Sequence, residues 1–333
     1  PRLKIAIYYN NWKKPKLEIY QNFSSLIVTY FQEVMEYVNS KQKKNVTSVI
    51  GFINNLGHFF WQDLSGIYYC YRNDLLGKIE RFAVGPYAKM ELKSIMPEIP
   101  DSKILKVPEM SDSEKFQFFL KNNSFCFRMT EHFISQECTE RVYKVAWNKC
   151  SPDLIKILTN IREKKEVFPL VWINVRGHNK SWISQEKGYA NIINKLSLDF
   201  PNLGIVFDGW IDCNDIVKNI QKRLKPNIKV YSTLGCPLHE SIVWGNYIDA
   251  YIAVVGSGLT ITSWLNNKPG VAYANRGHLK QKSFWSKVKE KSIEPTFLDV
   301  SEVVEVGTGG WGNYEIKWEV IYDKIFPILR SLE

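Results

Sequence analysis

Long apolar runs are missing from this 333-residue sequence. None approaches the roughly 18 residues that span a bilayer, so we expect no transmembrane helix. Six cysteines are scattered without a C-x-x-C pair, which disfavours a zinc site and favours reduced thiols. The charged start Pro1-Arg2-Leu3-Lys4 leads directly into a strand-like segment, so we also expect no signal peptide. These absences predict a cytoplasmic protein, either free or bound peripherally at the inner face of the membrane.

Three motifs of well-known enzyme classes are also missing. No G-x-x-x-x-G-K-[ST] loop occurs, which argues against a P-loop kinase. No G-x-S-x-G elbow occurs, which argues against an α/β-hydrolase. The acidic stretch Asp208-Gly209-Trp210-Ile211-Asp212 does not have the D-x-D spacing, so we expect no bound metal.

The composition is that of an ordinary globular protein with a basic surface. Hydrophobic residues make up 45% of the chain and charged residues 23%. Lys and Arg number 44 against 34 Asp and Glu, and the resulting charge of +10 favours anionic partners such as nucleotide-linked substrates or an anionic membrane. The basic residues are spread along the chain without a recognition motif, so we expect no nucleic-acid partner.

The chain is longer than one core usually spans, and its pattern divides into two halves. We place a first domain at residues 1–150 and a second at 151–333. In the first half we expect strands at 5–9, 47–53, 78–85 and 125–127, and helices at 19–38, 113–120 and 136–147. Strand, helix and strand in succession indicate an α/β domain.

The second half alternates more regularly. Strands are expected at 170–175, 204–207, 228–231, 251–255 and 271–273, and helices at 154–164, 185–198, 215–224, 238–244 and 259–265, with a closing helix at 314–332. Successive strand–helix steps predict a parallel sheet with right-handed connections. The fold class is therefore α/β, with two Rossmann-like domains.

The most informative stretch is Gly256-Ser257-Gly258, which follows the buried strand at 251–255. The N–H groups of the helix start, with the hydroxyls of Ser257 and Thr260, would face whatever lies beyond the strand end. Such a turn at the carboxyl edge of a parallel sheet is a site for phosphate or diphosphate. The alternative is an ordinary strand-to-helix turn without a ligand.

The region around this turn resembles the donor-domain motif of bacterial heptosyltransferases. The similar residues are His239-Glu240, the stretch from Ile248 to Gly258, and Lys268-Pro269-Gly270-Val271. The sequence departs from that motif at Thr262, where those enzymes carry His, and at Val255, where they carry Asp. The resemblance implies a GT-B glycosyltransferase, in which two Rossmann-like domains face each other across a cleft and the C-terminal one holds a nucleotide-sugar donor. It also implies that Glu240 contacts the ribose; the alternative is that Glu240 is an exposed acid at a helix start.

The order of motifs along the whole chain resembles a second GT-B group, which contains the xylan-decorating transferases and the extracellular O-GlcNAc transferase. The motifs are Asn55 to Asp63, Asn174 to Trp182, and Val255 to Thr260. By this resemblance Asp63 is the first choice as the base that deprotonates the acceptor, and His58 is the second. The alternative is that Asp63 is a structural carboxylate and His58 a structural histidine.

Further basic residues in the second half are candidates for binding an anion. Arg176, at the end of a strand, and Lys180, in the loop that follows it, are predicted to bind the donor diphosphate. Alternatively, Arg176 pairs with Asp208. Arg276, His278 and Lys280 form a basic loop that would contact either the donor phosphate or an anionic acceptor.

Together these features predict a metal-independent, inverting hexosyl- or pentosyltransferase of polysaccharide or glycoconjugate biosynthesis. A nucleotide sugar is its co-substrate, no further cofactor is expected, and the acceptor is a glycan or a lipid-linked glycan. The alternatives are a nucleotide-sugar epimerase of the same double-Rossmann build, or a basic nucleic-acid-binding protein.

Overall fold

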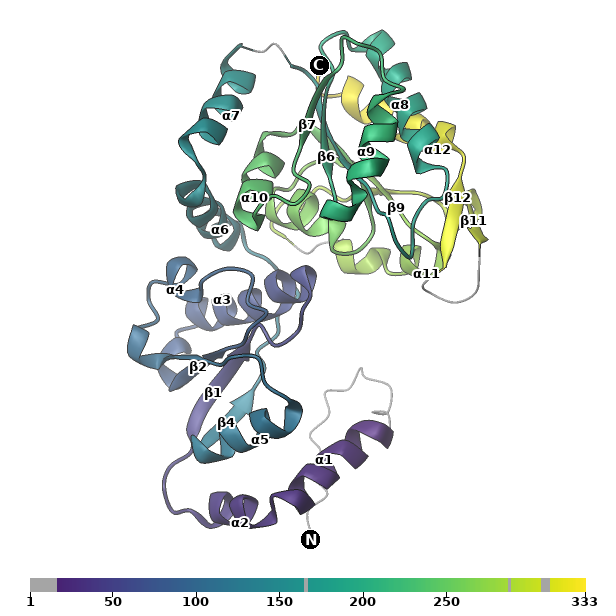
Figure 1. The fold of residues 1–333 in the computed structure, drawn as a ribbon. Helices are drawn as coiled ribbons and strands as arrows, with labels where there is room; N and C mark the ends of the chain where they lie inside the picture. Colours follow the sequence, from purple (N-terminus) through teal and green to yellow (C-terminus); the bar gives the residue numbers. More distant parts are fainter. Residues whose placement is uncertain (1–16, 165–166, 287–288, 307–311) are drawn as a thin grey trace.

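A computed structural model describes residues 17–164, 167–286, 289–306 and 312–333. It shows two α/β bodies, each built on a parallel sheet (Figure 1). The strand predicted at 5–9 lies outside the described residues. No helix in the described part of the chain is long and apolar enough to cross a membrane.

The first sheet has the strand order β3-β2-β1-β4, and all its pairs are parallel. Its strands are β1 (Asn45–Ile50), β2 (Arg81–Val84), β3 (Ile104–Lys106) and β4 (Ser124–Phe127). The helices of this body are α1 (Leu17–Thr29), α2 (Phe31–Asn39), η1 (His58–Leu64), η2 (Leu76–Lys78), α3 (Ser65–Arg72), α4 (Leu92–Ile95), η3 (Asp101–Lys103) and α5 (Asp112–Lys121). Strand β3 was not predicted, because it is three residues long and lies among prolines.

The helix predicted at 19–38 is broken in two at Tyr30. This residue has φ −112° and ψ 38°, outside the helical region, and its hydroxyl bonds to the Ser113 hydroxyl on α5. The break lets α2 turn and pack on α5. Apolar spacing of three and four residues continues across it, which is why the sequence pattern does not reveal it.

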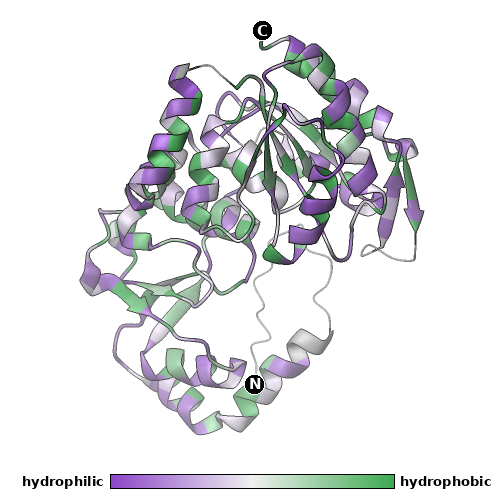
Figure 2. Cartoon of the chain, turned by 45° about the horizontal axis from the view of Figure 1, so that its top comes forward, coloured by the Kyte–Doolittle hydropathy of each residue, from purple (hydrophilic) through white to green (hydrophobic). Residues whose placement is uncertain are grey.

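The second sheet has the strand order β10-β9-β8-β5-β6-β7, again entirely parallel. Its strands are β5 (Leu170–Asn174), β6 (Gly204–Asp208), β7 (Lys229–Ser232), β8 (Ala250–Val254), β9 (Gly270–Tyr273) and β10 (Thr296–Phe297). Every residue of β5, β8 and β9 is buried, as expected for strands covered on both faces. Figure 2 shows these apolar strands in green between helices that carry purple, hydrophilic stretches.

The helices of this half are α6 (Gln136–Lys149), α7 (Pro152–Lys164), α8 (Gln185–Asp199), η4 (Ile211–Cys213), α9 (Asn214–Gln221), α10 (Leu238–Tyr247), η5 (Thr260–Leu265), α11 (Arg276–Leu279), η6 (Lys282–Trp285), η7 (Val300–Glu302) and α12 (Trp318–Arg330). Helix α6 packs on α10, where Trp147 stacks on Tyr247, and also on the first body, where Arg141 pairs with Glu98. The predicted domain boundary at residue 150 stays a prediction.

The closing helix begins later than predicted. Residues 313–316 form strand β12 (Asn313–Ile316), which pairs antiparallel with β11 (Val303–Val306), and α12 starts at Trp318. The side chains of Tyr314 and Ile316 are buried and those of Asn313 and Glu315 are less so, which is the two-residue alternation of a strand. The helical prediction was wrong here because four residues are too few to distinguish the apolar repeat of a strand from that of a helix.

Candidate functional site

Each sheet has one place where the chain reverses its direction of winding. In the first sheet the strands run from β1 through β2 to β3, and β4 then returns to the other side of β1. In the second sheet they run from β5 through β6 to β7, and β8 returns beside β5. Ligands of open α/β sheets bind at such switch points, beyond the carboxyl ends of the strands. The predicted site residues follow β1, β5 and β8, so most of them lie at these two points.

The two switch points contact each other through η1 and η5, both of which are π-helices. A Cβ atom at Gly57, directly before η1, would lie 3.4 Å from the Trp264 ring and 3.5 Å from the Thr260 hydroxyl on η5. Trp61 of η1 stacks on Trp264, with ring centroids 5.1 Å apart. Single turns of π-helix are rare and are frequent at functional sites. The turn after β8 therefore lies close to the segment that carries His58.

At the second switch point, β5 and the Gly256-Ser257-Gly258 turn touch through Asn174. A Cβ at Gly258 would lie only 2.8 Å from the Asn174 side-chain oxygen, and Gly256 has φ +127°, a conformation that favours glycine. Asn174 in turn donates from Nδ2 to Asp208 at 2.8 Å. Both glycines are thus required by the local geometry.

The helix after the turn differs from the prediction in one respect. Thr260 was expected to offer its hydroxyl to a phosphate, but its side chain is fully buried and faces Gly57. The N–H groups of Leu259 and Thr260 bond back to the carbonyls of Gly256 and Ser257. Ser257 is exposed, so within this turn its hydroxyl, and not that of Thr260, is open to a ligand.

Arg176, Lys180 and His278 form a cationic cluster at the same edge of the sheet, after the strands β5 and β9 that flank β8. Lys180 Nζ lies 3.0 Å from His278 Nε2, which joins the loop after β5 to α11, the helix that follows β9. The Asn275 side-chain oxygen accepts from the His278 backbone N–H, so it also accepts from Nδ1 at 2.9 Å. Nε2 of the neutral ring is then the acceptor for Lys180.

Arg176 and Lys180 carry charges of the same sign, and both disfavour protonation of His278. Burial, and next the Arg176 charge, lower the pKa of Lys180. Burial lowers the pKa of His278, and the charges of Lys180 and Arg176 lower it further. An anion placed among the three groups would relieve this repulsion.

The predicted alternative, an ion pair between Arg176 and Asp208, is not formed. The Arg176 guanidinium donates to the Asn179 carbonyl at 2.5 Å and to its side-chain oxygen at 3.0 Å. Asp208 instead accepts from Asn174 and from the Thr233 hydroxyl at 3.0 Å. The charge of Arg176 is therefore not neutralised by the neighbouring strand end.

The rest of the predicted basic loop points elsewhere. Arg276 Nε donates to the Val303 carbonyl at 2.9 Å, which ties it to the β11–β12 hairpin, and Lys280 is exposed. Glu240 lies in the first turn of α10, half-buried near Cys236, whose thiol pKa is raised by burial and then by the Glu240 charge. Only His278 of the loop joins the cationic cluster.

On the first body, Asp63 is a buried carboxylate with both oxygens engaged. It is 2% exposed. Oδ2 accepts from the Gly51 N–H at 2.9 Å, directly after β1, and Oδ1 accepts from Arg128 Nε at 2.6 Å, directly after β4. Asp63 thus fastens η1 to both strands of the first switch point. A base must reach the acceptor hydroxyl, so this geometry favours the structural alternative for Asp63 over the catalytic prediction.

His58 begins η1 and is half-buried beside the Gly57 contact to η5. Its Nδ1 lies 2.6 Å from the Gln62 side-chain oxygen. Asn55 accepts from the His58 backbone N–H at 3.1 Å and fixes the start of the helix. The structure shows no bond between His58 and Asp63, since each bonds to another partner.

An aromatic column runs through the contact between the two bodies. His132 stacks on Trp61 at 4.3 Å, Trp61 on Trp264 at 5.1 Å, and Trp264 on Trp285 at 4.0 Å. Phe284, which is 49% exposed, lies against Trp61 at 5.6 Å. Of these residues His132 and Phe284 are exposed, whereas Trp264 and Trp285 are buried.

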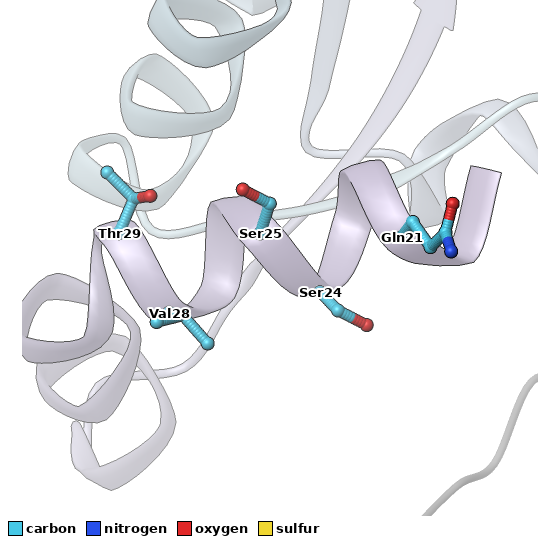
Figure 3. Close-up of a pocket in the computed structure, with 5 residues that line it drawn as sticks. All are labelled: Gln21, Ser24, Ser25, Val28 and Thr29. Atoms are coloured by element: carbon cyan, nitrogen blue, oxygen red, sulfur yellow. The ribbon is translucent and has the colours of Figure 1, made fainter. Parts of the chain in front are cut away.

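Two cavities among the described residues lie away from these strand ends. Figure 3 shows one of about 460 Å³, lined by α1 alone through Gln21, Ser24, Ser25, Val28 and Thr29. Another, of about 670 Å³, lies at the amino edge of the second sheet, where Leu170, Asp249 and Lys268 precede or begin strands. Within the described ranges, no group of three His, Cys, Asp or Glu side chains is placed to hold a metal.

Comparison with known proteins yields structural matches only. The sequence matches no protein-family model and no curated protein. The structure is similar to the glycosyl transferase family 9 protein of Veillonella parvula DSM 2008, at 10% identity and TM-score 0.52, with 87% of this chain and 97% of that one covered. It is also similar to E. coli ADP-heptose lps heptosyltransferase II, at 11% identity and TM-score 0.53, with 86% and 99% covered.

These matches establish the fold. The predicted α/β architecture of two Rossmann-like domains is confirmed, and it is the GT-B fold of glycosyltransferases. The resemblance to the xylan-transferase group stays a prediction. The sequence analysis assigned no role to Arg128, nor to Asn174 and Gln62, which lie within the motifs it named. Arg128 and Asn174 could have been found as polar residues at the ends of predicted strands.

Proposed function

We propose that this protein is a metal-independent, inverting glycosyltransferase that uses a nucleotide-sugar donor. The observation that carries the proposal is the cationic cluster of Arg176, Lys180 and His278 at the carboxyl edge of the second sheet, where β8 ends in the Gly256-Ser257-Gly258 turn next to β5 and β9. A diphosphate bridging the cluster and the turn would satisfy the exposed Ser257 hydroxyl and offset the repulsion between Arg176 and Lys180. The heptosyltransferase of similar fold is named for ADP-heptose, which supports a nucleotide-linked donor here.

The same cluster explains how the reaction could proceed without a divalent ion. The leaving group of the transfer is a nucleoside diphosphate, and fixed positive groups can stabilise its developing charge. Arg176 would donate two hydrogen bonds to phosphate oxygens, and Lys180 would contribute a compact positive charge. Metal independence remains a prediction of this proposal.

We assign the general base to His58 in place of Asp63. His58 begins η1 next to Gly57, where η1 meets η5, and it is half-buried, whereas the Asp63 oxygens are occupied by Gly51 and Arg128. The exposed rings of Phe284 and His132 nearby suit the apolar faces of a sugar, which supports a glycan acceptor.

The test is a transfer assay with a panel of nucleotide sugars and glycan acceptors in excess EDTA. We expect acceptor-dependent release of nucleoside diphosphate, with the anomeric configuration of the product inverted. A requirement for Mn²⁺ or Mg²⁺ would contradict the metal-independent mechanism. Conversion of the donor without an acceptor would instead indicate an epimerase or a hydrolase.

A further inference from the structure

We propose that Gln62 is a positioning residue that fixes the tautomer of His58, so that Nε2 carries the lone pair and faces the acceptor. The inference rests on the proposed function, in which His58 is the base. It concerns a residue that no sequence motif singled out. Its support is a chain of hydrogen bonds that runs from the ends of β1 and β4 to the His58 ring.

The orientation of the Gln62 amide follows from Arg128. The Arg128 Nη2 atom lies 3.1 Å from Gln62 Oε1. A guanidinium can only donate, so the amide atom facing it must be the oxygen. The same oxygen lies 2.6 Å from His58 Nδ1. Nδ1 must therefore carry the hydrogen, and the neutral ring keeps its lone pair on Nε2, the nitrogen a base needs.

The other end of the amide is also held. Gln62 Nε2 lies 3.3 Å from His132 Nε2, and the His132 ring is itself stacked on Trp61. Trp61 donates from its indole nitrogen to the His132 carbonyl at 3.0 Å. Gln62 is thus bound on both sides and has little freedom to flip.

Arg128 is fixed in its turn by Asp63, through the 2.6 Å bond from Nε to Oδ1. This gives Asp63 a place in the mechanism without contact to substrate, because it holds the guanidinium that orients the Gln62 oxygen. The titratable or charged groups of the network around His58 are Arg128, Asp63 and His132. From the facing η5, Thr260 and Trp264 approach Gly57, and neither titrates in the accessible range.

The test compares Gln62→Glu, Gln62→Leu and the exposed control Gln42→Glu, which makes the same change of charge away from the network. Gln62→Glu keeps an oxygen for Nδ1 but adds a negative charge that favours the imidazolium. We expect the acidic limb of its kcat/KM profile to move to higher pH by about one unit or more, with activity recovered above that limb. Gln62→Leu should lose about tenfold or more in kcat at every pH, as misplaced general bases do.

A readout independent of turnover is the ¹⁵N NMR spectrum of histidine-labelled protein, with the His58 signals assigned by loss in His58→Ala. We expect neutral His58 to be protonated at Nδ1 in the wild type and in Gln42→Glu, and to become a mixture of tautomers in Gln62→Leu. A wild-type ring protonated mainly at Nε2, or a tautomer unchanged in Gln62→Leu, would overturn the inference. Because this spectrum needs no substrate, it separates failure of the inference from failure of the proposed function.

Discussion

At the scale of single residues, the largest revision concerns the acid that the sequence placed first. Asp63 lies in the predicted segment, but its carboxylate is turned into the protein and shared between Gly51 and Arg128. A sequence reveals which residue types follow a strand and leaves open which way each side chain points. A π-helical turn holds more residues than an α-helical turn, so the side chains after it point in other directions than α-helical spacing predicts. The direction of the Asp63 side chain was therefore harder to infer from the sequence.

This assignment predicts different effects for the two candidate bases. His58→Ala should lower turnover by roughly 10²–10⁴-fold and leave folding intact, because it removes a general base at the surface of the contact. Asp63→Asn should mainly lower the free energy of unfolding, by about 3 kcal/mol, the lower end for a broken buried pair because Arg128 is 30% exposed. Steady-state kinetics and urea denaturation measure the two. Some loss of turnover is also expected, because Asp63 holds Arg128 and through it Gln62. An inactive Asp63→Asn protein of normal stability that still carries the His58 hydrogen on Nδ1 would return Asp63 to the role of base.

A second residue-scale prediction concerns His278 and pH. Its pKa is lowered in the fold by burial and by Lys180 and Arg176, so the unfolded chain takes up the proton more readily and the free protein loses stability as pH falls through about 6.5. A bound diphosphate favours the imidazolium, so the stabilisation by a nucleotide sugar should grow as pH falls from 7.5 to 5.5. Thermal unfolding with and without the nucleotide sugar measures this difference. In His278→Asn, the stabilisation by a nucleotide sugar should no longer grow as pH falls. A nucleoside without phosphates should show no such growth with the wild type. If the growth persists in His278→Asn, His278 is not the group that responds to the diphosphate.

At the scale of elements, the regular part of the chain was predictable and the site-forming part was less so. Strands β5, β6, β8 and β9 and the helices between them were placed from apolar runs and turn residues, because strands buried on both faces give a strong signal. The β11–β12 hairpin, the break at Tyr30 and the two π-helices were missed. Each depends on contacts made in the folded chain, such as the bond of Tyr30 to Ser113, which local spacing does not encode.

The turn after β8 gives a prediction at this scale. Gly258→Val should abolish stabilisation by nucleotide sugars, because its Cβ would meet the Asn174 oxygen at 2.8 Å and displace either the turn or the end of β5. The control is Gly77→Val, whose Cβ meets no atom within 4 Å. Isothermal titration would compare the two, with circular dichroism to confirm folding. Normal nucleotide affinity in Gly258→Val would remove the turn from the donor site.

At the scale of the whole molecule, the proposed base lies on the first body and the proposed donor site on the second. Their relative position depends on the contact between the two bodies. The column from His132 to Trp285 crosses from the first body to the second beside His58. Stacked aromatic pairs contribute about 0.5–1.5 kcal/mol each beyond the area they bury. In the proposed function, we therefore expect the column to set the position of the base relative to the donor.

Trp61→Ala should affect turnover and nucleotide binding differently. We expect turnover to fall at least tenfold, since small misplacements of catalytic groups are costly, while nucleotide affinity stays near that of the wild type. Trp318→Ala, which removes a ring stacked edge-on against Tyr322 on α12, serves as the control. Equal losses of turnover in both variants, or a parallel loss of nucleotide affinity in Trp61→Ala, would show that the column does not position the base.

In the proposed function, the second body binds a nucleotide-linked diphosphate through the cationic cluster. The most direct measurement is the thermal unfolding of the protein across a panel of nucleotide sugars, for the wild type, for the double variant Arg176→Gln/Lys180→Gln and for the exposed control Lys187→Gln/Lys222→Gln, which removes the same charge from the same body. At a ligand concentration of about 100 times Kd, we predict about 2.7 kcal/mol of stabilisation in the wild type and the control, and almost none in the double variant. Equal stabilisation of all three proteins, or none by any nucleotide sugar, would contradict the claim.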